Sequence, residues 1–291
     1  MDLSKILKEK RPNVTDSTIK TYKSLLTNLY KSCFSKDDEM CIKDFDNDKV
    51  ILPYLIGLPV NTRKTKLAAL IVLTGNKEYS KQMTTDIQEL ISHNLKQEKN
   101  EKQTDNMISP EEVQTIYNRV ESNAKVHLQK KEFNNNDFDA IQNWILLALT
   151  SGIFIAPRRS ADWNMKWKNY DVDKDNYVDV KNSQFVFNSY KTSKLYGKSM
   201  VDIPKPLKLI LNKWFKINPT DYIIFDNKKQ PLNSPQITHK LNNIFGKKIS
   251  TSMLRHIYLT HKFGNVNLQD LNDTAAAMGT SKMEALQYVK H

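Results

Sequence analysis

The chain has 291 residues, of which 44 are lysine or arginine and 32 are aspartate or glutamate, so its formal net charge is +12 and its pI is about 9.4. This length allows two ordinary domains that each bury a hydrophobic core, and it excludes a need for disulfide or metal staples. The basic balance favours a polyanionic partner such as nucleic acid, although charge alone does not separate DNA from RNA or an anionic membrane.

Cysteine spacing and hydropathy bear on whether the protein binds a metal, is secreted or spans a membrane. Cys33 and Cys41 match no zinc-ligand spacing, and no histidine pair completes a ligand set, so we expect no metal and two reduced core residues of an intracellular protein. Residues 2–11 are polar and lack the apolar run of a signal peptide, which argues against secretion. The longest uncharged stretch, residues 140–157, is interrupted by polar residues and therefore predicts a buried helix rather than a membrane span.

Residues 1–95 carry the spacing of amphipathic helices. Apolar residues recur on one helical face over residues 19–30, where Asp16 or Ser17 can cap the start. Further helices are predicted at residues 62–73 and 85–95, after a stretch rich in Pro and Gly around residues 53–59. The sequence therefore predicts a small all-helical domain at residues 1–95.

A change of composition marks a boundary after this domain. Residues 96–106 (KQEKNEKQTDN) contain no apolar residue, which is typical of a solvated linker, and we place that linker at residues 96–108. Ser109 then combines an N-cap with a following Pro110 and two glutamates in the first helical turn. A second domain, residues 109–291, is predicted to begin with this helix.

The second domain is predicted to be mainly α-helical with a small antiparallel β-sheet. Residues 144–149 read as a buried helix, whereas residues 177–204 change to the alternating pattern of a β-hairpin. Helical spacing then returns in five segments, which are residues 207–215, 236–245, 252–263, 268–278 and 282–289.

Four short segments of this domain contain candidate site residues, and the first two hold basic groups. Residues 157–163 read PRRSADW, in which Arg159 has the acidic Asp162 three positions later. Arg158 directly precedes Arg159, and an apolar-x-Trp step follows at residues 165–167, so both arginines are candidates. The second segment, YKTSK at residues 190–194, offers Lys191 ahead of a Val-x-Ile-Pro strand.

The other two segments hold an arginine and a tyrosine. Residues 252–256 read SMLRH and contain Ser252, Arg255 and His256. Residues 278–281 read MGTS and contain Thr280, and Tyr288 follows shortly after. In this order the four segments resemble the motifs of the tyrosine recombinase (phage integrase) family. The first segment looks closer to recombinases of large viruses and eukaryotic mobile elements than to typical bacterial ones. The resemblance favours Arg159 by its offset to Asp162, whereas Arg158 has the family's distance to the apolar-x-Trp step, so Arg159 is preferred and Arg158 is kept as the alternative.

The resemblance covers residues 109–291 by motif and implies a fold and an activity. It implies a tyrosine recombinase catalytic domain behind an N-terminal helical (SAM-like) core-binding domain that clamps duplex DNA with it. It implies site-specific cleavage and rejoining of DNA strands through a 3′-phosphotyrosyl intermediate, with Tyr288 as nucleophile. Only three residues follow Tyr288, so we expect the C-terminal helix that members often donate to a neighbour to be absent or very short.

The residue types suit phosphodiester exchange without a cofactor or metal. A phenol is a weak nucleophile until it loses its proton, because its ordinary pKa is about 10. Two guanidiniums, Arg159 and Arg255, can stabilise the charge of the transition state, and Lys191 can protonate the leaving 5′ oxygen. Ser252 and Thr280 stand where the family has histidine or tryptophan and offer a hydroxyl but no base near neutral pH, so His256 is a candidate imidazole.

Several alternatives remain open at this stage. The partner expected is double-stranded DNA, held by a homo-tetramer through a Holliday junction, with no membrane and no small-molecule substrate. Arg63, Lys64 and Lys66 are candidates for phosphate contacts, beside the alternative of an ordinary charged helix face. A DNA-binding protein that does not cut, a type IB topoisomerase-like enzyme and, less favoured, a structural or RNA-binding protein are the competing interpretations.

Overall fold

The computed structural model describes residues 1–34, 40–95, 98–263 and 268–289. The chain divides into two compact units, Met1–Lys96 and Gln97–His291, each with its own hydrophobic core. Among the helices formed by the described residues, none is long and apolar enough to cross a membrane.

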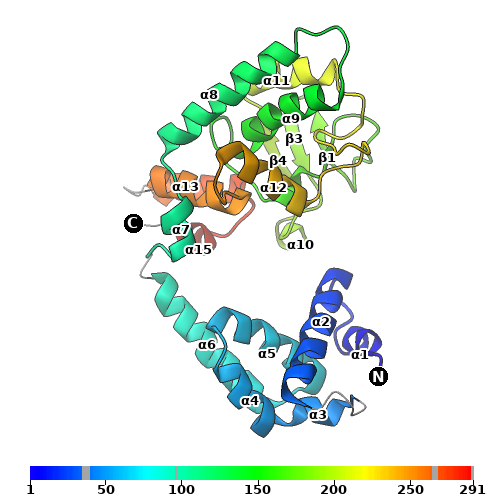
Figure 1. The fold of residues 1–291 in the computed structure, drawn as a ribbon, viewed down its shortest axis with the longest axis vertical. Helices are drawn as coiled ribbons and strands as arrows, with labels where there is room; N and C mark the ends of the chain where they lie inside the picture. Colours follow the sequence, from blue (N-terminus) through cyan, green and yellow to red (C-terminus); the bar gives the residue numbers. More distant parts are fainter. Residues whose placement is uncertain (35–39, 96–97, 264–267, 290–291) are drawn as a thin grey trace. The chain divides into compact units, whose positions relative to one another are not determined.

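The first unit is helical (Figure 1). Its helices are α1 (Leu3–Lys10), α2 (Asp16–Cys33), α3 (Ile42–Asp46), α4 (Asp48–Ile56), α5 (Val60–Thr74) and α6 (Lys77–Leu95). Leucine side chains of α2 and α5 form much of its core, and the buried Tyr79 hydroxyl donates a hydrogen bond to the Phe45 carbonyl at 2.8 Å. Cys33 lies half-buried at the edge of this core, but Cys41 is exposed and is not the core residue that we expected.

The helices of the first unit agree in part with the apolar spacing. The predictions of α2 and α5 are confirmed, and α5 ends at Gly75, whose φ of 74° is left-handed. Helix α6 begins at Lys77 rather than at residue 85, because the Asn76 side chain accepts a hydrogen bond from the Glu78 amide at 2.8 Å and starts the helix earlier. Helix α4 was missed, since Pro53 lies inside it rather than in a loop.

Part of the expected linker is a helix of the second unit. Within residues 96–108, the segment Glu101–Asn106 forms α7. Asn100 and Gln103 make a capping box, in which each side chain accepts a hydrogen bond from the other's backbone amide at 3.0 Å. The buried residue of α7 is the polar Gln103, which is 5% exposed, so a search for apolar residues could not find the helix.

The second unit contains a four-stranded sheet with the order β1-β2-β3-β4. Its strands are β1 (Met165–Lys166), β2 (Asn176–Asp179), β3 (Gln184–Phe187) and β4 (Ser199–Asp202). The pairs β2-β3 and β3-β4 are antiparallel as expected, with Phe185 opposite both Val178 and Val201, whereas the short β1 pairs with β2 in parallel. The sheet is therefore mixed, and the fold class, mainly helical with one small sheet, is confirmed.

Helices surround this sheet, and α8 lies along α9, whose side chains are buried over most of its length (Figure 1). The Ser109 cap predicted from the sequence is present, with its hydroxyl accepting from the Glu112 amide at 3.2 Å. The helices are α8 (Pro110–His127), α9 (Asn135–Thr150), η1 (Ser160–Trp163, a 3-10 turn), α10 (Ser193–Tyr196), α11 (Lys205–Phe215), α12 (Ser234–Phe245), α13 (Thr251–Phe263), α14 (Leu268–Ala277) and α15 (Lys282–Leu286).

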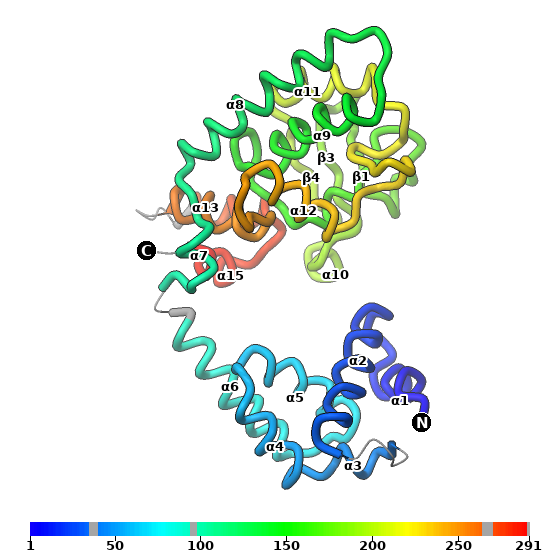
Figure 2. The backbone as a smooth tube through the Cα atoms, viewed as in Figure 1, coloured from blue at the N-terminus to red at the C-terminus, as the bar shows by residue number. Residues whose placement is uncertain are grey.

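The end of the chain packs as a small cluster of its own within the second unit. Side chains of α13, α14 and α15 bury one another, including Phe263, Met278 and Ala285. Helix α15 ends at Leu286 rather than at residue 289, so Tyr288 stands in the turn that follows it. In Figure 2 this last segment, drawn in red, returns beside α13, which brings Tyr288 to the side chains of that helix.

Candidate active site

Tyr288 is held mainly through its backbone. Its amide donates to the Ala285 carbonyl at 3.0 Å, and its carbonyl oxygen accepts from Nδ1 of His256 at 2.8 Å and from the Thr260 hydroxyl at 3.3 Å. The rings of His256 and Tyr288 lie 4.5 Å apart, centroid to centroid. Because backbone contacts fix the main chain, the phenol ring is directed onto the inner face of α13.

The phenol of Tyr288 lies against the guanidinium of Arg255. Nη1 of Arg255 donates to the tyrosine hydroxyl oxygen at 2.9 Å, and Cζ lies 4.3 Å from the centre of the ring. Arg255 is 1% exposed, and its Nε and Nη2 make no hydrogen bond within the part of the chain that the structure describes. Burial lowers the pKa of this guanidinium, but an arginine starts so high that it stays charged. A cation in this position stabilises negative charge that develops on the phenol oxygen.

The structure separates the roles of the two neighbouring arginines of the first motif. Arg158 is 1% exposed and is used internally: Nε donates to Asp162 at 3.0 Å and Nη1 to the Ala277 carbonyl at 2.6 Å, while Cζ lies 3.8 Å over the Phe187 ring. Burial lowers the pKa of Arg158, and the carboxylate of Asp162 opposes this shift. Arg158 therefore joins η1, β3 and the end of α14, while its Nη2 has no hydrogen-bond partner among the described residues.

Gly279 is required beside this buried guanidinium. Its φ is 65°, in the left-handed region that side chains rarely adopt, and a Cβ atom there would lie 2.9 Å from Nη2 of Arg158. Both constraints select glycine at this position, the second residue after α14, and its carbonyl oxygen accepts hydrogen bonds from Arg159 and Thr192.

Arg159 faces the same site as Arg255. Its Nη1 donates to the Gly279 carbonyl at 2.9 Å, and its Nη2 forms an ion pair with Glu284 at 3.1 Å. Its side chain is 16% exposed, whereas that of Arg158 is 1% exposed. Burial lowers the pKa of Arg255 most, and the charge of Arg159 adds to that shift, so the two guanidiniums act on each other. Of the two arginines that the sequence left open, this geometry favours Arg159.

Asp162 lies beneath the arginines as a buried carboxylate. It is 1% exposed, and its Oδ1 has no hydrogen-bond partner among the described residues. Burial raises its pKa, although Arg158, Arg159 and Arg255 each oppose that shift. The packing of Trp163 edge-on against Phe185, with ring centroids 5.5 Å apart, holds η1 and with it Asp162 in place.

Lys191 lies in the turn before α10, which connects β3 to β4, and its side chain is exposed. The adjacent Thr192 hydroxyl donates to the Gly279 carbonyl at 3.0 Å, so the turn is tied to the same carbonyl as Arg159. The charge of Lys191 contributes to lowering the pKa of Glu284. The structure therefore brings the predicted lysine near the arginines from a separate element.

The residues at the histidine positions of the family take different places. Ser252 is exposed in the first turn of α13, whereas Thr280 is 5% exposed in the turn that precedes α15. His256 contacts the backbone of Tyr288 rather than its hydroxyl, and this contact suits positioning more than removal of the phenol proton. Gln103 of α7 lies 3.3 Å from Nε2 of the same imidazole.

Glu284 is a site residue that the sequence analysis did not find. Burial opposes ionisation, but the Thr280 hydroxyl and the charges of Arg159, Lys191 and Arg255 outweigh it and hold the pKa of Glu284 below its usual range. The residue stands four positions before Tyr288 on the predicted last helix. That position was the available signal, because residues four apart on a helix share one face.

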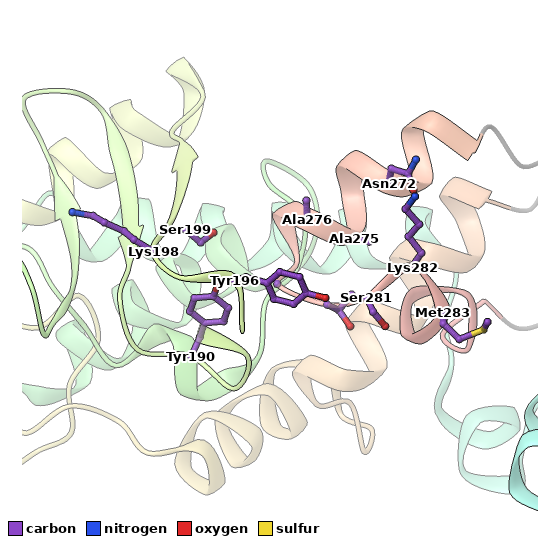
Figure 3. A pocket seen from close by; sticks show the side chains of 12 residues that line it. Tyr190, Tyr196, Lys198, Ser199, Asn272, Ala275, Ala276, Ser281, Lys282 and Met283 are labelled. Atoms are coloured by element: carbon purple, nitrogen blue, oxygen red, sulfur yellow. The ribbon is translucent and has the colours of Figure 1, made fainter. Parts of the chain in front are cut away.

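A cavity of about 600 Å³ opens beside the site (Figure 3). It lies between the hairpin turn, with Tyr190, Tyr196 and Lys198, and the segment that contains Asn272 and Met283. No group of three or more His, Cys, Asp or Glu residues suited to a metal ion occurs in the ranges that the structure describes.

The three candidate phosphate contacts of the first unit differ in exposure, since Arg63 is buried and Lys64 and Lys66 are partly exposed. Arg63 is 8% exposed and fully engaged, with Nε and Nη2 on the Asp86 carboxylate at 2.7–2.9 Å and Nη1 on the carbonyls of Ile56 and Leu58. The expectation that Arg63 contacts DNA therefore has to be corrected, because its donors are used within the fold. The partly exposed Lys64 and Lys66 stay candidates.

Comparison with known proteins reveals a likeness of structure rather than of sequence. No family model matches the chain, and no curated protein matches it by sequence. A lambda integrase tetramer bound to a Holliday junction is similar with a TM-score of 0.53 and 14% identity over 99% of this chain and 75% of that one. A fragment of lambda integrase, a dimer bound to a COC′ core site, gives 0.51 and 14% identity over 98% and 92%. The chain has the fold of lambda integrase. XerA recombinase is also similar over 99% of this chain and 92% of that one, at 14% identity and a TM-score of 0.44. The family resemblance stated from the four motifs is confirmed at the level of this fold.

Proposed function

We propose that this protein is a tyrosine recombinase that cleaves and rejoins DNA strands through a covalent link to Tyr288. The observation that carries the proposal is the 2.9 Å hydrogen bond from Arg255 to the Tyr288 hydroxyl, with Arg159 in the same site. These residues come from three motifs far apart in the sequence, and the lambda integrase fold brings them together. A tyrosine and two arginines at one point are the groups that phosphodiester exchange requires.

The proposed reaction uses each group once. The Tyr288 oxygen attacks the scissile phosphorus and its phenolic proton leaves to solvent, while the bond from phosphorus to the 5′ oxygen breaks. Lys191 gives a proton to that oxygen, so the products are a 3′-phosphotyrosyl bond and a free 5′-hydroxyl. Attack by the 5′-hydroxyl of another strand reverses the step and rejoins the DNA. Arg159 and Arg255 stabilise the charge of the transition state.

Double-stranded DNA is the proposed partner. The formal charge of +12 provides general attraction for phosphates, and the two lambda integrase structures that share this fold were solved on DNA. One of them is a tetramer on a Holliday junction, so we extend the proposal to a homo-tetramer that exchanges strands pairwise. We also propose that the protein acts on DNA inside the cell and that its gene belongs to a mobile element or a viral genome.

A second function, DNA binding without cleavage, is favoured by one observation. Ser252 and Thr280 provide hydroxyls where the related motifs have histidine or tryptophan, and His256 is bonded to a backbone carbonyl. No imidazole is thereby assigned to proton transfer at the tyrosine hydroxyl. The arginines, Lys191 and the basic surface would still hold a duplex. Relaxation of supercoiled DNA without site preference would instead indicate a type IB topoisomerase-like enzyme.

A covalent-trapping assay tests the proposed cleavage. Nicked duplexes made from the ends of the DNA element that carries the gene are incubated with the protein and resolved under denaturing conditions. We expect a protein–DNA band that is absent with Tyr288→Phe, which removes only the hydroxyl. A duplex that binds but yields no band with the wild-type protein would support the non-cutting function instead.

A further inference from the structure

The carboxylate of Glu284 occupies a position among cationic groups. It pairs with Nη2 of Arg159 at 3.1 Å, and the charges of Lys191 and Arg255 also act on it. A guanidinium binds carboxylate and phosphate oxygens by the same planar geometry, so a carboxylate here occupies donors that a phosphate would use.

Arg255 is covered by the same segment. The Tyr288 ring lies over the Arg255 guanidinium, and the tyrosine hydroxyl oxygen accepts a hydrogen bond from Nη1 of Arg255. Arg255 is only 1% exposed. Glu284 and Tyr288 lie four residues apart, in α15 and the turn after it. One short segment thus engages both arginines, and its α15 begins at the Ser281 cap, directly after Thr280.

We propose that Glu284 is an internal substitute for the scissile phosphate, so that α15 keeps the anion site closed until a DNA phosphate displaces the carboxylate from Arg159. This inference deepens the proposed recombinase function and rests on it. Glu284 is 36% exposed in its side chain and can exchange its arginine partner for water when it is displaced. An exposed ion pair contributes little free energy, so an incoming DNA phosphate that makes several contacts at once competes with it successfully.

The closed site has a consequence for selectivity. Isolated anions meet an arginine that already has a partner, whereas a duplex presents a row of phosphates whose contacts add up. Occupation of Arg159 by Glu284 therefore suppresses binding of small anions more than binding of DNA. Release of α15 also frees the segment that holds Tyr288, which couples opening of the anion site to adjustment of the tyrosine.

Sulfate is a suitable probe because it resembles phosphate and needs no cleavage. The midpoint of thermal unfolding is measured against sulfate concentration for the wild type, for Glu284→Gln and for Asp270→Asn. Asp270 pairs with Lys262, away from the arginines, so its variant makes the same change of net charge. We expect Glu284→Gln to bind sulfate about three- to fivefold more tightly than the wild type, as loss of an exposed ion pair allows. Asp270→Asn should match the wild type, and adding Arg159→Ala to Glu284→Gln should abolish the gain.

Equal sulfate affinity in folded Glu284→Gln and in wild type would overturn the inference. If the variant does not fold, the wild type alone still decides: with carboxyl-labelled glutamate, sulfate saturation should return the pKa of Glu284 towards its ordinary value, and an unchanged pKa contradicts displacement. The two proposals fail separately. If no Tyr288-dependent covalent band forms, the proposed cleavage is contradicted even where sulfate displaces Glu284. If the band forms but sulfate does not displace Glu284, only the proposed role of Glu284 is contradicted.

Discussion

Nε2 of the Gln103 side chain lies 3.3 Å from Nε2 of His256. Its Oε1 already accepts from the Asn100 amide in the capping box of α7, so the amide turns its NH2 group towards the imidazole. Nδ1 of His256 must carry a hydrogen, because it donates to the Tyr288 carbonyl. The ring can accept from Gln103 only when it is neutral, and α7 is thereby linked to the backbone of Tyr288.

Gln103→Leu tests this link. The change removes the donor to His256 while keeping a side chain of similar length, so the imidazole and the Tyr288 backbone lose a restraint. We expect covalent-product formation to slow about two- to tenfold, as loss of one hydrogen bond implies, with duplex affinity unchanged. Single-turnover trapping and a binding titration measure the two quantities. Gln114→Leu, an exposed glutamine on α8, serves as control, and an equal slowing in both variants would remove the positioning role.

We expect alanine substitutions at the neighbouring Arg158 and Arg159 to act on different properties, stability for Arg158 and cleavage for Arg159. Arg158→Ala leaves the buried Asp162 without its partner, which we expect to destabilise the protein by about 3–5 kcal/mol. Arg159→Ala removes a partly exposed pair and should leave the unfolding midpoint nearly unchanged while abolishing the covalent band. Chemical denaturation and trapping on the same samples separate the two. If Arg158→Ala is stable but does not cleave DNA, Arg158 rather than Arg159 is the catalytic arginine.

This pair illustrates what sequence could and could not predict. The motifs fixed the set of candidate residues, and the offset from Arg159 to Asp162 pointed to the favoured arginine. The actual contacts of Arg158, however, are the Phe187 ring and the Ala277 carbonyl, which lie far away along the chain. Glu284 was missed for the same reason, since its partner Arg159 is 125 residues distant and no local spacing records an ion pair of that range.

Helices were predictable where apolar spacing or a Ser-Pro start gave a local signal, as in α2 and α8. The capping box of α7 and the buried ion pair of Arg63 were not, because polar residues that are satisfied within the fold look like surface residues in a sequence. The same ambiguity led us to expect Arg63 at the DNA.

The charges of α5 predict which residues of the first unit contact DNA. Lys64→Ala and Lys66→Ala should each weaken duplex binding uniformly across sequences and reduce the slope of log affinity against log salt by about 1. Asp86→Asn, which breaks the buried Arg63 pair, should instead lower the stability of the first unit by about 3–5 kcal/mol. Binding isotherms between low and moderate salt, paired with unfolding curves, measure both. If the salt slope is unchanged in both lysine variants, Lys64 and Lys66 face the solvent and do not contact DNA phosphates.

Asp137 predicts a pH dependence of stability. Its buried carboxylate accepts from Lys130, from the Asn134 amide at 3.0 Å and from His127 at 2.6 Å, and these contacts, with that of Lys130 largest, hold its pKa well below the usual range. A carboxyl whose pKa is lowered by folding stabilises the protein fully above its ordinary pKa of about 4, and this stabilisation is lost as the pH falls towards the lower value.

Asp137→Asn should therefore be less stable than the wild type at pH 7, and the difference in unfolding free energy should shrink as the pH falls below about 4. Urea unfolding at a series of pH values, read by tryptophan fluorescence from the second unit, gives this difference directly. Asp139→Asn removes a carboxylate that is 54% exposed on the same helix and should show little difference at any pH. A gap for Asp137→Asn that stays constant down to acidic pH would mean that the lost cap geometry of α9, and not the ionised carboxylate, provides the stabilisation.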